Sequence, residues 1–168
     1  MADVAVVTGG AEGIGLAIAR RLAVDGALVV IADTAVEKGE AAAAAIGAVF
    51  ARLDVTSEED WANLVAVVQA NGELRVLVNN AGVNPGPAPL EELPFEVWRR
   101  VLSVNLDGAF LGCRMAVRLM KTGGAIVNVG SAAGVRVVGE MPAYVASKAG
   151  LHALTRSVSL YCGRKGLG

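Results

Sequence analysis

The sequence predicts an α/β fold, a doubly wound parallel sheet of five strands with helices on both faces. Short runs rich in Val and Ile alternate with longer stretches of helical period along all 168 residues. The strand-like runs are apolar throughout, as expected of strands that are covered on both faces. Right-handed crossovers between such strands bring all their carboxyl ends to one edge of the sheet, where ligands bind.

Three strand–helix units are predicted in the first half of the chain. The strands are Val4–Thr8, Leu28–Ile31 and Val49–Leu53. The first helix begins at Ile14, the first residue of its apolar stripe, and ends at Asp25-Gly26, where glycine takes the usual C-terminal position. The second, Val36–Ile46, follows from the high helix propensity of its alanines. The third starts at a capping box of Thr56 and Glu59.

The second half continues the same alternation. Its strands are Val76–Val78 and Ala125–Val129, and a proline-rich loop separates the first of them from a long helix that begins at Phe95. A last helix is expected from about Tyr144 to Leu160. No repeat, linker or shift of composition divides the chain, so residues 1–168 are expected to form one domain. The fifth strand is expected to leave its outer edge without a partner, which favours self-association.

Composition and charge exclude several classes of protein. Apolar residues make up 54% and charged residues 18%, which argues against disorder. The formal net charge of −1 shows no basic excess for nucleic acid or anionic lipid, so a small-molecule substrate or a second subunit is the expected partner. Two cysteines and one histidine are too few for an ordinary zinc site, so no metal is expected. No secretory leader or membrane span is visible, and we expect a cytoplasmic location.

A glycine-rich loop follows the first strand directly. Gly9, Gly13 and Gly15 lie in Thr8–Gly15, and the predicted helix begins among them at Ile14. Backbone N–H groups and the positive end of a helix at such a turn bind a pyrophosphate, and glycines let it approach closely. The alternative is a tight turn with close helix–sheet packing and no ligand.

An acidic residue at the end of the second strand supports the dinucleotide interpretation. Asp33 lies eighteen positions beyond Gly15, where a carboxylate accepts hydrogen bonds from the adenosine ribose. It would repel a 2′-phosphate, Thr34 beside it is uncharged, and Glu12 adds negative charge to the loop. The expected cofactor is therefore NAD rather than NADP. The alternative for Asp33 is a solvated residue of a turn.

Two further strand ends carry short polar or small residues. Asp54 and Val55 follow the third strand, and Asn79, Asn80, Ala81 and Gly82 follow the fourth. They reach the same sheet edge as the glycine loop and are expected to frame the adenine and the centre of the site. For the two asparagines, a role in stabilising the turn through side-chain-to-backbone hydrogen bonds is an equal alternative.

The catalytic candidates lie after the fifth strand. Ser131 precedes Tyr144 by thirteen residues, and Lys148 lies four residues after Tyr144 on the same helix face. A nearby ammonium favours an ionised phenol, which would let Tyr144 act as a general acid or base. Ser131 would hold the substrate oxygen. The alternatives are a surface tyrosine–lysine pair and an ordinary loop hydroxyl.

Taken together, these motifs resemble the short-chain dehydrogenase/reductase family over the whole length and in the same order. The matching features are the Thr8–Gly15 loop, Asp33, Asn79-Asn80-Ala81-Gly82, Asn105 in the long helix, and Ser131 with Tyr144 and Lys148. The resemblance implies a Rossmann-type NAD-binding fold and an oxidoreductase that interconverts a secondary alcohol and a ketone. It also implies that Tyr144 exchanges the proton, Ser131 positions the substrate, Lys148 binds the nicotinamide ribose, and Asn105 supports a relay water.

The resemblance carries further expectations. Family members usually continue beyond the matched region with segments that cover the substrate, so a catalytically impaired dinucleotide-binding fragment or regulator is the alternative function. A methyltransferase of similar topology is disfavoured by Ser131, Tyr144 and Lys148. Homo-oligomers are expected through the helices that contain Phe95 and Tyr144. His152, Cys113 and Cys162 are expected to serve packing, and the sequence does not identify the substrate.

Overall fold

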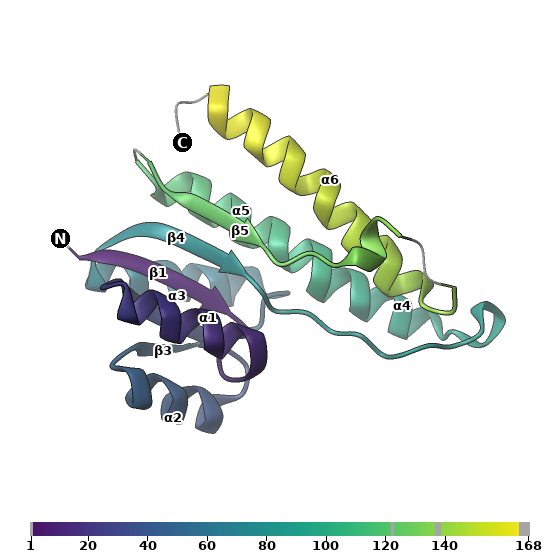
Figure 1. Cartoon of the computed structure of the whole chain (residues 1–168), viewed down its shortest axis with the longest axis horizontal. Helices are drawn as coiled ribbons and strands as arrows, with labels where there is room; N and C mark the ends of the chain where they lie inside the picture. The colour runs from purple at the N-terminus through teal and green to yellow at the C-terminus, as the bar shows by residue number, and fades with distance from the viewer. Residues whose placement is uncertain (1, 122, 137–138, 165–168) are drawn as a thin grey trace.

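The protein is a single parallel sheet flanked by helices, as the sequence predicts. The computed structural model describes residues 2–121, 123–136 and 139–164 (Figure 1). The strands lie side by side in the order β3-β2-β1-β4-β5, all parallel. The bounds are β1 Asp3–Thr8, β2 Leu28–Asp33, β3 Val49–Arg52, β4 Glu73–Asn79 and β5 Ala125–Asn128. The order reverses at β1, which is where a doubly wound sheet binds its ligand.

Both faces of the central strands are buried, which explains their uninterrupted apolar sequences. Val4 and Val6 point to the core under α3 (Glu58–Asn71) and α5 (Gly108–Leu119), together with Trp61 and Leu64. The alternate residues Ala5 and Val7 point to the opposite core, which α1 (Gly13–Val24) and α2 (Val36–Ile46) cover. Side chains alternate between the faces of a strand, so a strand that is covered twice needs apolar residues at every position.

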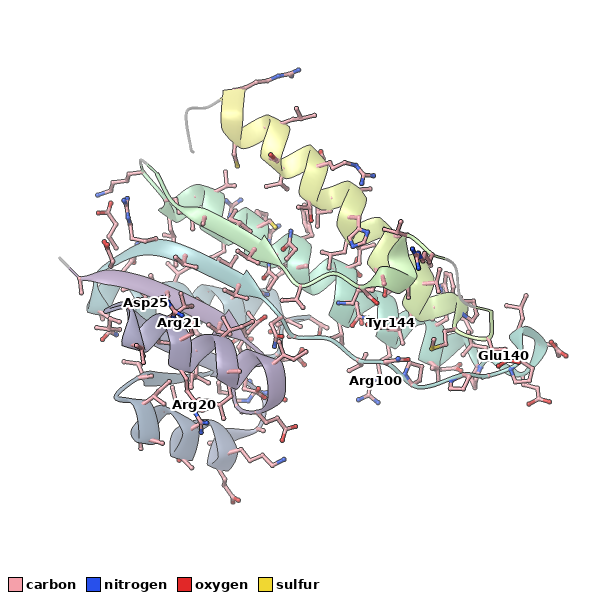
Figure 2. The ribbon with its side chains drawn as sticks, in the orientation of Figure 1. Arg20, Arg21, Asp25, Arg100, Glu140 and Tyr144 are labelled. Atoms are coloured by element: carbon pink, nitrogen blue, oxygen red, sulfur yellow. The ribbon has the colours of Figure 1, made fainter. Side chains whose placement is uncertain are left out.

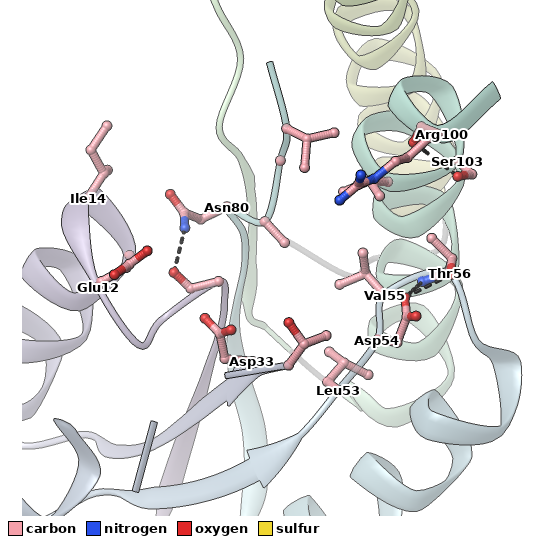
Figure 3. A pocket seen from close by; sticks show the side chains of 17 residues that line it. Glu12, Ile14, Asp33, Leu53, Asp54, Val55, Thr56, Asn80, Arg100 and Ser103 are labelled. Atoms are coloured by element: carbon pink, nitrogen blue, oxygen red, sulfur yellow. Dashed lines mark hydrogen bonds between the residues drawn. The ribbon is translucent and has the colours of Figure 1, made fainter. Parts of the chain in front are cut away.

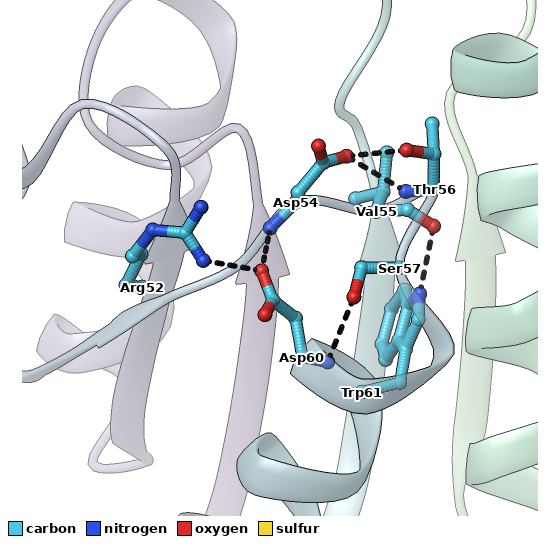
Figure 4. A network of polar contacts seen from close by, with 7 residues as sticks. All are labelled: Arg52, Asp54, Val55, Thr56, Ser57, Asp60 and Trp61. Carbon is cyan, nitrogen blue, oxygen red and sulfur yellow. Dashed lines mark hydrogen bonds and ion pairs between the residues drawn. The ribbon is translucent and has the colours of Figure 1, made fainter.

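The start of α3 lies one residue later than the predicted capping box. The N-cap is Ser57, whose hydroxyl accepts a hydrogen bond from the Asp60 amide at 3.1 Å (Figure 4). Thr56 instead donates its hydroxyl to Asp54, so the predicted cap of Thr56 with Glu59 is wrong. Thr56 and Ser57 are each followed three residues later by an acidic residue, so the sequence allows either as N-cap. The Thr56 hydroxyl binds the Asp54 carboxylate instead, which leaves Ser57 as the cap.

The long predicted helix is broken by a wider turn. It consists of α4 (Phe95–Leu102), the π-helical segment η2 (Ser103–Asp107) and α5. Asn105 lies in η2 and is buried. Periodicity does not reveal such a one-residue insertion, although π turns often mark functional sites. Two short 3₁₀ turns, η1 (Leu90–Glu92) and η3 (Ala132–Gly134), complete the connections.

The last helix, α6 (Pro142–Arg164), lies alongside α4, η2 and η3 on the α5 side of the sheet (Figure 1). It covers no part of the opposite face, where Val127 of β5 is 48% exposed while Val4 to Val7 of β1 are fully buried. Within the described residues, β5 pairs only with β4, so it forms the expected edge of the sheet. The described part of the chain also has no helix that is long and apolar enough to cross a membrane.

Candidate active site

A cavity of about 680 Å³ opens at the carboxyl ends of the strands (Figure 3). Ten residues that the sequence assigned to cofactor binding line it: Gly9, Glu12, Ile14, Gly15, Asp33, Asp54, Val55, Asn80, Ala81 and Gly82. Gly13, Tyr144 and Lys148 do not. The lining also includes residues that the sequence did not single out for this role, namely Thr34, Leu53, Thr56, Val83, Arg100, Ser103 and Val104.

Glycine is needed at different positions of the loop for different structural reasons. Gly9 and Gly13 have φ angles of 62° and 56°, in the left-handed region that disfavours side chains. A Cβ on Gly13 would meet no protein atom within 4 Å, whereas one on Gly15 would lie 2.1 Å from the Gly9 carbonyl oxygen. Gly15 is therefore required by close packing of α1 against the loop. Gly13 permits the turn that begins α1 and leaves open space beside it.

Residues after β4 hold the glycine loop in place. Asn80 donates from Nδ2 to the carbonyl oxygens of Thr8 and Gly9, both at 3.0 Å. The Thr8 hydroxyl in turn accepts the backbone N–H groups of Asn80 and Ala81. Asn79 is buried and donates to Asn128 at 2.8 Å, away from the cavity. Asn80 thus shapes the cavity indirectly, while Asn79 ties β4 to β5.

Two carboxylates stand at the cavity in fixed orientations. Asp33 accepts the backbone N–H groups of Ala11 and Ala35 at 3.1 and 3.0 Å, one on each oxygen. Asp54 accepts the backbone N–H and the hydroxyl of Thr56, and these hydrogen bonds lower the pKa of Asp54 below its ordinary value. Both side chains keep acceptor capacity for hydroxyl or amino groups of a ligand.

Glu12 is paired with a cation that sequence reasoning overlooked. Nζ of Lys38, on the first turn of α2, lies 2.8 Å from Oε2 of Glu12. The pair raises the pKa of Lys38 and lowers that of Glu12. Glu12 therefore adds no uncompensated charge to the loop, in contrast to the prediction. The available signal was topological, because α2 starts three residues after Asp33 at the same sheet edge.

The proposed catalytic side chains lie behind this cavity, around the start of α6. Lys148 is 5% exposed, and its Nζ donates to the Val129 carbonyl oxygen at 2.8 Å. Burial lowers the pKa of Lys148. The ammonium lies 5.9 Å from the centroid of the Tyr144 ring, and a Cβ on Gly82 would lie 3.6 Å from it. Lys148 therefore connects a cavity-lining residue with Tyr144.

The two hydroxyls of the predicted site are available for a ligand. Tyr144 lies beside the segment that follows β5 (Figure 2), and its hydroxyl has no hydrogen-bond partner among the described residues. Ser131 accepts the Ala133 backbone N–H at 3.2 Å, which orients its oxygen and leaves its proton free to donate. A phenol and a serine hydroxyl at one end of α6 suit proton exchange with an oxygen atom of a substrate.

Asn105 acts through its neighbours. Its Oδ1 accepts the Val83 backbone N–H at 2.7 Å, and its Nδ2 donates to the Val83 carbonyl and to Ser147 at 3.0 Å. Ser147 is fully buried and donates to the Tyr144 carbonyl at 2.8 Å. The amide thus links the segment after β4 to the helix that carries Tyr144. Both donor protons of the side chain are used within the protein, so any water held by this residue would bind elsewhere on it.

His152 and the cysteines lie apart from these groups. His152 packs against Gly130, where an added Cβ would lie 2.4 Å from Nε2. Cys113 and Cys162 are both buried and reduced. Burial raises the pKa of Cys113, which makes its thiol a poor nucleophile.

Comparison with known proteins agrees with this arrangement. The model of the short chain dehydrogenase family matches residues 3–167. The chain belongs to this family.

Three relatives illustrate its place among the short-chain dehydrogenases. A 3-beta-hydroxysteroid dehydrogenase of Comamonas testosteroni is 41% identical over 97% of this chain and 65% of its own length. An NADP-dependent (R)-specific alcohol dehydrogenase of Lentilactobacillus kefiri is 39% identical over 96% and 67%. A cis-4-hydroxycyclohexanecarboxylate dehydrogenase of Sinomonas cyclohexanicum is 43% identical over 98% and 69%. The chain thus spans about two thirds of the length of these relatives.

Proposed function

We propose that this short-chain dehydrogenase interconverts a secondary alcohol and a ketone with NAD as cofactor. The observation that carries the proposal is the position of Lys148, whose ammonium lies near both cavity-lining Gly82 and the ring of Tyr144. A nucleotide in the cavity and a substrate at Tyr144 would meet at this lysine. NAD supplies the hydride chemistry when bound, and the protein supplies orientation and the proton.

The nucleotide would be held mainly by fixed groups. The amides at the start of α1 face the open space beside Gly13, which suits a pyrophosphate. Asp33 would accept the hydroxyls of the adenosine ribose, and Asp54 with Val55 would border the adenine. These groups need little rearrangement on binding, because hydrogen bonds within the protein already hold both carboxylates.

The proton would pass through Tyr144. In reduction its hydroxyl donates a proton to the ketone oxygen and becomes a phenolate, and in oxidation the phenolate accepts the proton of the alcohol. The Ser131 hydroxyl donates a hydrogen bond to the same oxygen. The ammonium of Lys148 stabilises negative charge on the phenol and can bind a ribose hydroxyl. Such acid–base catalysis contributes about 10² to 10⁴ in rate.

The preference for NAD rests on Asp33. Its carboxylate lines the cavity with both oxygens oriented by backbone N–H groups, and it would repel a 2′-phosphate. Replacing Asp33 by Asn and Thr34 by Arg should narrow or invert the ratio of NADH to NADPH affinity. Tighter binding of NADPH than of NADH by the parent chain would contradict the proposal.

Turnover by a tyrosine variant tests the function. We expect Tyr144→Phe to lower oxidation of NADH with a panel of cyclic and open-chain ketones by at least about 100-fold, because the phenylalanine ring has no proton to exchange. Tyr161→Phe, at the chain's other tyrosine, is the matched control and should keep parental activity. Equal turnover by Tyr144→Phe and the parent would reject the assignment.

The alternative is a chain that binds the nucleotide without turning substrate over. Two observations motivate it. The chain spans 65% of the length of the Comamonas testosteroni relative, and Val127 of β5 is 48% exposed. Binding of NADH without activity on any ketone of the panel would favour this alternative.

We also propose that a second copy of the chain packs against α5 and α6. Phe110 of α5 and Leu160 and Tyr161 of α6 are all exposed, and Phe110 and Tyr161 line a groove between the two helices. Large exposed apolar side chains that gather on two neighbouring helices are typical of an interface. A charged residue at Phe110 should lower the sedimentation coefficient if the groove is the dimer surface.

A further inference from the structure

The ion pair of Glu12 and Lys38 joins the glycine loop to α2 at the rim of the cavity. The paired atoms are 2.8 Å apart, although 26 residues separate them in sequence. Both side chains are largely exposed, at 73% for Glu12 and 65% for Lys38. Exposed ion pairs contribute little to stability, so this one can be broken at small cost.

Lys38 lies at the same end of the cavity as Asp33, the proposed ligand of the ribose. It lies on the first turn of α2, which begins three residues after Asp33, and its ammonium is 2.8 Å from Oε2 of the cavity-lining Glu12. Asp33, Thr34 and Glu12 all line this end of the cavity (Figure 3). If Asp33 accepts the hydroxyls of the adenosine ribose, the 2′ position of that ribose lies at the same rim as the Lys38 ammonium.

The Lys38 ammonium at this rim would attract a phosphate on the ribose, but it is already paired with the Glu12 carboxylate. Glu12 neutralises the Lys38 ammonium, so the pair offers no net positive charge to such a phosphate. Lys38 itself does not line the cavity and reaches its rim through Glu12. Among the described residues the one cation that lines the cavity is Arg100, which enters from α4 on the opposite wall (Figure 3). Asp33, Glu12 and Lys38 together thus set the preference at this rim between a ribose with a 2′-hydroxyl and one with a 2′-phosphate.

We propose that Lys38 is a specificity-determining residue. Its ammonium can bind an adenosine 2′-phosphate, but the ion pair with Glu12 prevents this contact. This inference rests on the proposed function, because it assumes that adenosine binds at Asp33. It differs from simple repulsion by Glu12, because removal of Glu12 should help a 2′-phosphate only while a cation is present at position 38.

Titration calorimetry with two small probes at low ionic strength tests the proposal. The probes are 5′-AMP and adenosine 2′,5′-bisphosphate, which differ only in the 2′-phosphate. We expect Glu12→Gln to tighten bisphosphate binding about five- to tenfold and to change AMP binding less than about twofold. The gain should vanish in Glu12→Gln/Lys38→Met and persist in Glu12→Gln/Lys38→Arg.

A matched control is Asp25→Asn, which breaks the exposed pair of Arg21 and Asp25 at the other end of α1 and removes the same charge. It should leave the affinities for both probes unchanged. A gain that survives loss of the cation at position 38, or no gain in Glu12→Gln, would overturn the role of Lys38 while AMP binding upholds the nucleotide site. If the parent bound neither probe nor NADH, the proposed function would fail, and this inference with it.

Discussion

The region proposed to bind the nucleotide and the region proposed for catalysis, called below the nucleotide region and the catalytic region, are built in different ways. In the first, formed by β1 to β3, α1, α2 and the end of β4, the polar groups of Thr8, Asn80 and Asp33 are satisfied within the protein. In the second, formed by β5, η3 and α6, the Tyr144 hydroxyl has no partner among the described residues. The first region is therefore a pre-formed binding surface, whereas the second positions a hydroxyl through the backbone and leaves it free to meet a ligand.

Burial follows the same division. The strands beside the glycine loop are sealed on both faces, whereas Val127 of β5 is half exposed. The catalytic region compensates with internal polar links, in which Asn105, Ser147 and the Tyr144 carbonyl form a buried chain. We therefore expect substitutions in the first region to affect nucleotide binding and stability, and those in the second to affect turnover.

Lys148 does not belong to one region alone, because its ammonium lies near both Gly82 and the Tyr144 ring. Its substitution is therefore the strongest test of a separation between binding and turnover. We expect Lys148→Met to lower turnover by about 10² or more, as a general acid–base partner is lost, and to weaken NADH binding as well. Steady-state kinetics and fluorescence titration of NADH measure the two effects. Unchanged NADH affinity would show that Lys148 belongs to the catalytic region alone.

The glycine loop should show the next largest effect. Gly15→Ala places a methyl group 2.1 Å from the Gly9 carbonyl oxygen, and such overpacking costs about 1–3 kcal/mol. Gly13→Ala meets only its unfavourable φ angle, which costs about 1 kcal/mol. Denaturant unfolding compares the two variants. If Gly13→Ala were the more destabilising, the account of close packing at Gly15 would be wrong.

Ser147→Ala tests the link from η2 to α6. It removes a buried hydroxyl that bonds Asn105 and the Tyr144 carbonyl, and loss of buried hydrogen bonds costs about 1–3 kcal/mol. We expect a lower kcat with little change in NADH affinity, because Ser147 positions Tyr144 and does not line the cavity. Ser159→Ala on the exposed side of α6 is the control, with neither effect expected.

The smallest effect concerns pH. Because hydrogen bonds from Thr56 hold the folded pKa of Asp54 below its ordinary value, the Asp54 carboxylate stabilises the fold above its unfolded pKa near 3.9. This stabilisation is lost as the pH falls through the folded pKa. Thr56→Val removes the hydroxyl hydrogen bond and should raise the midpoint of acid unfolding by on the order of 0.3 pH units. Thr34→Val, at the next strand end, should leave the midpoint unchanged.

Local sequence patterns were sufficient for the sheet and for most of the cavity. The fully apolar run at Val4–Thr8 and the glycine loop after it predict a buried strand and a turn, because these depend on neighbouring residues. The same logic located Asp33 and Asp54, since parallel strands end at one edge. The structure confirms the fold class, and within the described residues β5 pairs with β4 alone.

Features that depend on contacts between distant segments were not predictable. The pairing of Lys38 with Glu12 requires the position of α2 relative to the loop, and the entry of Arg100 into the cavity requires the packing of α4. The π turn at Asn105 leaves no periodic signal because it adds only one residue to a helix. Choosing Ser57 over Thr56 as N-cap depended on where the Asp54 carboxylate points.

The separation of binding from chemistry is tested most directly by the affinity of Tyr144→Phe for NADH. The substitution removes one hydroxyl that touches no described residue and lies outside the lining of the cavity. We predict that fluorescence titration gives a Kd within about twofold of the parental value, since no binding contact is lost. A Kd raised more than about tenfold would show that the nucleotide depends on the catalytic region, and would contradict the account.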